Sequence, residues 1–114
     1  MEIKNEDYHI SYDNKTMTIN CEGALRLGGI TEYVPIAELF NQVLDTEPHL
    51  ITFDMRQLQF LNSSGINVLS KFVIKVRQKK TVQMIVQGSE QIPWQNKSLK
   101  NLKRLMPSLQ LEWV

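Results

Sequence analysis

The sequence predicts a single α/β domain over residues 1–114, in which a mixed β-sheet of about five strands packs with three main helices in the order β-β-α-β-α-β-α-β. The length allows one hydrophobic core, because a chain of this size removes about two-thirds of its unfolded surface from water. Apolar and polar residues alternate near the N-terminus, which is typical of a hairpin. Further along, short apolar runs alternate with helical periodicity, which indicates strands joined by helices.

The first part of the chain carries the hairpin and the first helix. Alternation over residues 8–21 predicts two strands, with a polar turn at residues 13–15 and Cys21 on the apolar side. Beyond Thr31, the expected N-cap, apolar residues recur at the i, i+3, i+4 and i+7 positions of a helix that should end before Pro48. These apolar positions are Ile36, Leu39, Phe40 and Val43.

The remaining elements alternate strand and helix. A short, mostly apolar run after Pro48 predicts a strand at the centre of the sheet, covered on both faces. Pro93 opens the last helix and Pro107 ends it. We expect strands over residues 50–55, 82–86 and 109–113, and helices over residues 64–78 and 93–106.

Composition excludes several classes of protein. Thirteen basic and twelve acidic residues leave a net charge of +1, which does not provide the broad basic field of a nucleic-acid-binding protein. Cys21 is the only cysteine, so neither an internal disulfide nor a zinc site built on cysteines is possible. The first seven residues do not resemble a signal peptide, and no apolar run approaches the roughly 20 residues that span a bilayer. We therefore expect a cytoplasmic protein without a membrane segment.

Groups suited to catalysis are scarce. The two histidines, His9 and His49, do not have the spacing of metal ligands, and Cys21 is interpreted as a small core residue rather than a nucleophile. The sequence contains no G-x-S-x-G elbow, P-loop or G-x-G-x-x-G motif. We expect a protein that is not an enzyme and that has neither a metal nor a cofactor.

One segment stands apart, because it joins the central strand to a helix and places Asn62, Ser63 and Ser64 at the helix start. Such residues commonly cap a helix by accepting hydrogen bonds from its first free amides, and spacing alone favours this role. A phosphoryl group on a serine here would also lie at the positive end of the helix dipole. It would add about −1.5 to −2 charges to a surface that a partner must cover, and so prevent binding without unfolding the domain.

The same segment resembles the signature of the STAS domains, a family named for sulfate transporters and anti-sigma factor antagonists. In that family an aspartate ends a central strand, a hydrophobic-x-hydrophobic step follows, and Asp-Ser-Ser/Thr-Gly opens a helix. This chain has Asp54, then Leu58-x-Phe60-Leu61, then a helix start formed by Asn62, Ser63, Ser64, Gly65 and Ile66. The expected order of elements matches the family fold over nearly the whole chain.

The resemblance implies a bacterial signalling regulator that acts by partner switching. Ser63 would be the phosphoacceptor, with Ser64 as the second choice, and Asp54 and residues 62–66 would form the partner-binding motif. The implied partners are a serine kinase of histidine-kinase-like fold that doubles as an anti-sigma factor, and a phosphatase of the PP2C type. Asn62 departs from the family, because it keeps the capping acceptor but lacks the negative charge of aspartate.

Three alternatives follow from the same residues. A stand-alone STAS protein could instead bind and regulate an enzyme, such as a diguanylate cyclase. A receiver-like domain phosphorylated on Asp54 is disfavoured, because receivers hold magnesium with an acidic pair and only Glu22 lies near the corresponding place. The last helix is either a solvated basic face or a second docking surface, which would consist of Trp94, Lys97, Lys100 and Arg104.

Overall fold

An antiparallel meander opens the chain in the computed structural model, which describes residues 1–114. The strands are β1 (Glu2–Lys4), β2 (Tyr8–Asp13) and β3 (Thr18–Leu25). The predicted hairpin is confirmed by the β2–β3 register, in which Ile10 pairs with Cys21. The sheet has six strands rather than about five, because β1 adds to the edge of β2. A strand of three residues is too short to display an alternating pattern in the sequence.

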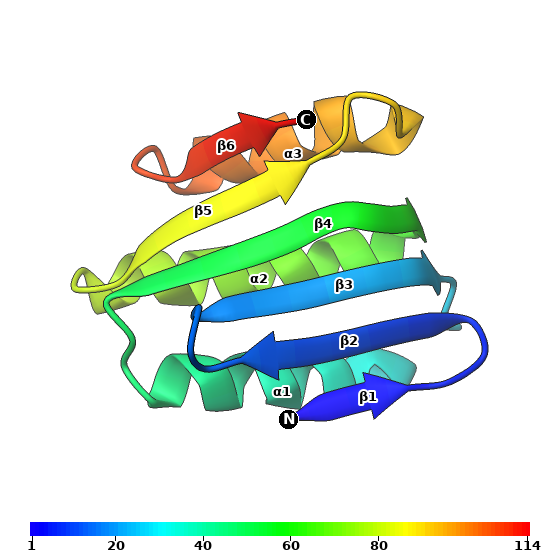
Figure 1. The fold of residues 1–114 in the computed structure, drawn as a ribbon, viewed down its shortest axis with the longest axis horizontal. Helices are drawn as coiled ribbons and strands as arrows, with labels where there is room; N and C mark the ends of the chain where they lie inside the picture. The colour runs from blue at the N-terminus through cyan, green and yellow to red at the C-terminus, as the bar shows by residue number, and fades with distance from the viewer.

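Three crossover connections complete the fold, and their helices lie behind the sheet in Figure 1. The strands follow the order β1-β2-β3-β4-β5-β6, with parallel pairing from β3 onward. Each right-handed crossover steps in the same direction, so all three helices cover the same face of the sheet. The remaining elements are the 3-10 helix η1 (Ile30–Tyr33), α1 (Val34–Asp45), β4 (Leu50–Leu61), α2 (Ser63–Lys79), β5 (Gln83–Gly88), α3 (Pro93–Leu105) and β6 (Gln110–Trp113).

A single core of 27 buried residues lies between the helices and the sheet. At its centre the rings of Phe40, Phe53 and Phe72 join α1, β4 and α2, with centroids 5.0 to 5.5 Å apart. Cys21 belongs to this core, and burial raises the pKa of its thiol to about 12. The thiol is therefore a protonated apolar group at neutral pH, as the sequence predicts.

Two expectations about the central strand are wrong. Helices cover only one face of β4, because its second face carries polar side chains such as Thr52 and Asp54. The strand also continues to Leu61 instead of ending at residue 55. Register shifts in the β3–β4 pairing interrupt its inside–outside alternation, so that Arg56 and Gln57 are both exposed. A β-bulge of this kind hides a strand from pattern analysis.

Thr31 does not cap α1, which is a further correction. It lies in η1, and the N-cap of α1 is Tyr33, whose side chain makes no capping hydrogen bond. Pro35 occupies the first turn of α1, where its missing amide costs little. None of the helices has the length and apolarity that crossing a membrane requires.

Candidate functional site

The start of α2 follows directly from the end of β4, at the edge of the sheet where β3 also ends. Asn62 is the N-cap and Ser63 is the first residue of the helix. The side chain of Ser63 is exposed to solvent and that of Ser64 is half-buried. The structure therefore places Ser63, the predicted phosphoacceptor, on an accessible helix start.

Asn62 holds this helix start to the neighbouring loop through both ends of its amide. Its Oδ1 accepts from the backbone N–H of Gly65 at 3.0 Å and from the Tyr33 hydroxyl at 2.6 Å. Its Nδ2 donates to the carbonyl oxygen of Leu27 at 2.8 Å. The backbone N–H of Asn62 also donates to the carbonyl oxygen of Leu25. One residue thus satisfies a helix amide and ties β4, η1 and the end of β3 together.

Tyr33 is the residue at this site that sequence reasoning missed. Its ring is buried, and burial is the main cause that raises the pKa of its hydroxyl, so the group stays protonated and can donate to Asn62. The two residues are 29 positions apart, and no local pattern links them. The only available signal was a tyrosine just before the apolar face of α1.

Gly65 allows α2 to approach Tyr33 closely. A Cβ at this position would lie 2.8 Å from the Tyr33 hydroxyl oxygen and 2.3 Å from Cδ1 of Leu61. The backbone of Gly65 is ordinary helix, so the requirement is for space rather than for unusual dihedral angles. The Asn-Ser-Ser-Gly sequence therefore works as a unit: Asn62 caps the helix, Gly65 allows close packing, and Ser63 between them is exposed.

Two backbone amides at this helix start remain available to an anion. Among the first amides of a helix, those without an intrahelical acceptor are the ones that bind phosphate. Asn62 and Gly65 direct their N–H groups to Leu25 and to the Asn62 side chain, which leaves those of Ser63 and Ser64. A phosphoryl group on Ser63 would lie next to them and at the positive end of the helix dipole.

The chain matches the family model of the STAS domain over residues 31–93, which extends from η1 to the start of α3. The protein belongs to the STAS domain family. No curated protein sequence matches the chain.

Two solved structures share the STAS fold along almost the entire chain. One is a chain in the crystal structure of the diguanylate cyclase SiaD in complex with its activator SiaC from Pseudomonas aeruginosa: the TM-score is 0.76 at 11% identity, covering 100% of this protein and 99% of that chain. The other is SiaC of Pseudomonas aeruginosa, with a TM-score of 0.74 at 12% identity, covering 98% of this protein and 94% of that chain. At this identity the similarity shows a common fold.

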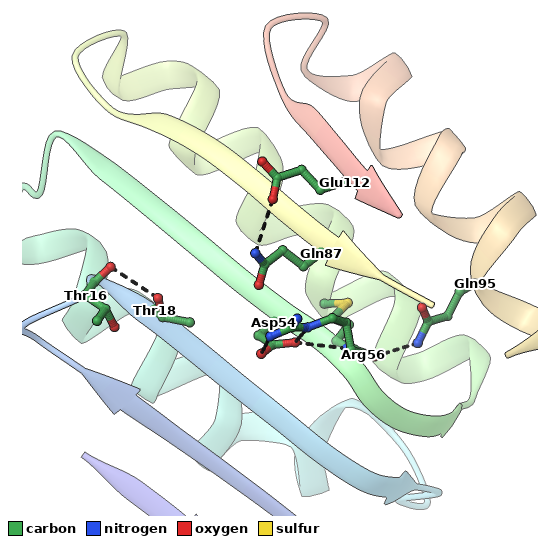
Figure 2. A network of polar contacts seen from close by, with 8 residues as sticks. Thr16, Thr18, Asp54, Arg56, Gln87, Gln95 and Glu112 are labelled. Carbon is green, nitrogen blue, oxygen red and sulfur yellow. Dashed lines mark hydrogen bonds and ion pairs between the residues drawn. The ribbon is translucent and has the colours of Figure 1, made fainter. Parts of the chain in front are cut away.

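Asp54 lies apart from the rest of the expected STAS motif. It sits within β4 rather than at its end, about 25 Å along the strand from Asn62, on the face without helices (Figure 2). Figure 2 shows its carboxylate paired with Arg56, with Nε and Nη2 at 2.9 and 2.8 Å from the two oxygens. The hydrogen bond from Arg56 is the main cause that lowers the pKa of Asp54.

The surroundings of Asp54 also do not resemble a receiver site. Receivers have strand order 2-1-3-4-5 with helices on both faces of the sheet, whereas the helices of this STAS domain cover one face. No group of three acidic, histidine or cysteine side chains could hold a metal ion. Asp54 is held in an ion pair with Arg56 on the sheet surface, and its part in partner binding stays a prediction.

The last helix divides the residues of the expected second docking surface into two groups. Trp94 is half-buried against the core, and its indole N–H donates to the carbonyl oxygen of Leu58 at 3.1 Å. Lys97, Lys100 and Arg104 are exposed. Trp94 thus contributes to the packing of α3 while part of it stays accessible beside three exposed cations, and the second docking surface stays a prediction.

Gln95, next to Trp94, is a second residue that sequence reasoning missed. It is fully buried, and its Nε2 donates to the carbonyl oxygens of Met55 and Leu58, while its Oε1 accepts from the backbone N–H of Ser89. Figure 2 shows it reaching from α3 toward β4. A polar residue four positions before Leu99, on the apolar face of the helix, was the signal that could have revealed it.

Proposed function

We propose that this protein is a non-catalytic cytoplasmic regulator that binds a partner protein and is switched by reversible phosphorylation of Ser63. The observation that carries the proposal is the exposure of Ser63 on a braced helix start that has two free amides. The full-length similarity to SiaC, an activator of a diguanylate cyclase, favours a regulated enzyme over sigma-factor machinery as the target.

The chemistry of the switch is an exchange of one phosphoryl group. A serine kinase of histidine-kinase-like fold transfers the γ-phosphoryl group of ATP to Oγ of Ser63, with release of ADP and the hydroxyl proton. A phosphatase of the PP2C type hydrolyses the phosphoester with water and restores the serine. The anchored Asn62 and Tyr33 keep α2 in place in both states. What changes is about two negative charges and their hydration at the surface that the partner covers.

The test compares serine variants in one phosphorylation assay. The chain is incubated with its kinase and ATP, and intact mass and phosphopeptide mapping locate the label in the native protein, in Ser63→Ala and in Ser64→Ala. We expect one phosphoryl group, present in the native protein and in Ser64→Ala but absent from Ser63→Ala. A label on Ser64 alone, or on Asp54, would contradict the proposal.

The consequence for binding is tested with the partner enzyme. We expect Ser63→Ala to bind as the unmodified protein does and Ser63→Asp to bind at least about tenfold more weakly, because a new charge must be desolvated in the interface. Ser108→Asp serves as the matched control, because Ser108 is an exposed serine in the turn before β6. Equal weakening by both variants would indicate a general charge effect and not a switch at Ser63.

A further inference from the structure

A groove with an apolar floor runs between α1 and α2, close to the phosphorylation site but separate from it. Its volume is about 210 Å³, and its floor is formed by Ala37, Phe40, Val68 and Phe72. At one end Ile30 and Val34 are 55% and 43% exposed. Large apolar side chains that are exposed together beside an apolar depression are typical of a surface that another molecule covers.

One wall of the groove carries a row of lysines. Lys71, Lys75 and Lys79 follow one another at i+4 spacing on α2, so they lie on successive turns of the same ridge. Lys71 and Lys75 line the apolar groove, and Lys75 and Lys79 line its polar continuation toward the end of α1. Lys75 donates to Oδ1 of Asn41 across the groove at 3.2 Å. The depression therefore combines an apolar floor with a cationic wall.

The charges of the helical layer show which occupant fits. Helices α2 and α3 each contain four basic residues and no acidic residue, while the acidic residues lie on η1, α1, the strands and the loops. Lys79 is paired with Glu47 at 3.8 Å, so the cations of the groove wall without an acidic partner are Lys71 and Lys75, and these favour an acidic partner protein. A second copy of this chain does not supply one, because its helices carry only three acidic residues, Glu32 on η1 and Glu38 and Asp45 on α1, and α2 and α3 are basic.

We propose that this groove binds an amphipathic helix of the partner protein, with apolar side chains on one face and acidic side chains along one flank. A helix satisfies its own backbone hydrogen bonds, whereas an extended segment would leave its amides facing an apolar floor that offers few polar groups. A third helix also packs into the groove between two helices by the ordinary interlocking of side-chain ridges.

This inference rests on the proposed function, and it explains how phosphorylation of Ser63 would weaken binding of the partner. Ser63 precedes Asn67 by one turn, and Asn67 lines the groove one turn before Lys71, so Ser63 heads the ridge that carries the lysines. The phosphate would stand about 12 Å along the helix from Lys71, where it meets the acidic flank of the partner helix. Repulsion between the phosphate and the acidic side chains weakens binding of the partner helix, although the apolar floor of the groove is unchanged.

The experiment selects the occupant without assuming a partner. A display library of amphipathic peptides of about 18 residues, with randomised flanks, is enriched on the full chain, and selected peptides are measured by fluorescence anisotropy. We expect enriched peptides to carry Asp or Glu along one flank and apolar residues at i, i+3, i+4 and i+7. Enrichment of basic or uncharged flanks, or no enrichment, would overturn the proposal.

Charge reversals then locate the binding surface. Lys71→Glu with Lys75→Glu should weaken binding of the selected peptide at least about tenfold, and Val34→Asp should weaken it at the apolar end. The comparison pair, Lys100→Glu with Arg104→Glu, changes net charge equally on α3 and should alter affinity less than about threefold. Equal losses would show general electrostatic attraction, and a loss confined to the α3 pair would place docking on α3. Either result overturns the proposal that the partner helix binds in the groove.

The Ser63→Asp variant separates this proposal from the proposed function. If the lysine reversals abolish peptide binding and Ser63→Asp weakens it, both proposals are supported. If the reversals abolish binding but Ser63→Asp leaves it unchanged, the groove stands and the switch does not act through it. If the reversals have no effect while phosphorylated Ser63 still releases the partner enzyme, the groove proposal fails alone.

Discussion

Asn62 shows why one residue departs from the family pattern at the most characteristic position of the motif. An aspartate would reproduce the contacts of Oδ1 with Gly65 and Tyr33 and would place a negative charge at the helix N-terminus. It could not reproduce the donation from Nδ2 to the carbonyl oxygen of Leu27, which lies 2.8 Å away. The amide at this position thus follows from the path of the loop between β3 and η1.

Replacing Asn62 with aspartate is expected to destabilise the protein. The variant Asn62→Asp sets a carboxylate oxygen against the Leu27 carbonyl, and the loss of that hydrogen bond outweighs the gain from the helix dipole. We expect the free energy of unfolding, measured with urea, to fall by about 1 kcal/mol. The variant Asn62→Ala also removes the cap, so we expect its free energy of unfolding to be lower than that of the native protein by about 2 kcal/mol. An Asn62→Asp protein as stable as the native one would show that the Leu27 contact contributes nothing.

At the scale of elements, α3 is attached to β4 just beyond the point where the pairing of β4 with β5 ends. The β4–β5 pairing ends at Asp54, and the carbonyl oxygens of Met55 and Leu58 beyond it are bound by the buried amide of Gln95. The indole of Trp94 adds a second donor to Leu58. A side chain therefore replaces the missing strand partner.

The attachment of α3 is tested by Gln95→Leu, which keeps an apolar side chain of similar size but removes every polar contact. The carbonyl oxygen of Met55 and the N–H of Ser89 would lose their partners in the interior. We expect the free energy of unfolding to fall by about 2 to 4 kcal/mol, and hydrogen exchange to rise over residues 55–59. Asn96→Leu, at the exposed neighbouring position, should change stability by less than about 0.5 kcal/mol. Similar losses in both variants would contradict this account.

The same elements show what the sequence allowed us to predict. The hairpin and the helices were recognisable because their residues follow a period of two or 3.6, and the serines of α2 because capping residues precede an apolar run. The second half of β4 was not recognisable as a strand, because bulges interrupt the alternation of buried and exposed residues. Contacts such as Tyr33–Asn62 and Gln95–Met55 join residues 29 and 40 positions apart, and no local periodicity records them.

For the whole molecule, the net charge of +1 conceals a separation of charge across the fold. The basic residues of α2 and α3 lie on the helical layer, while the open sheet face carries polar and paired groups such as Asp54 with Arg56. Composition cannot reveal this separation, because it depends on all three crossovers being on one face. The α1–α2 groove was unpredictable for the same reason.

A molecule with one continuous core should change its surface at Ser63 without changing its shape. Ser63→Asp places a negative charge in the first turn of α2, and we expect the free energy of unfolding to rise by about 0.3 to 1 kcal/mol. Backbone NMR shifts should change only near the α2 start and η1. Asn67→Asp, one turn further along, should gain less, because the dipole effect fades beyond the first turn. A fall in stability, or shift changes that spread through the strands, would mean that phosphorylation acts by deforming the domain rather than by repelling a partner.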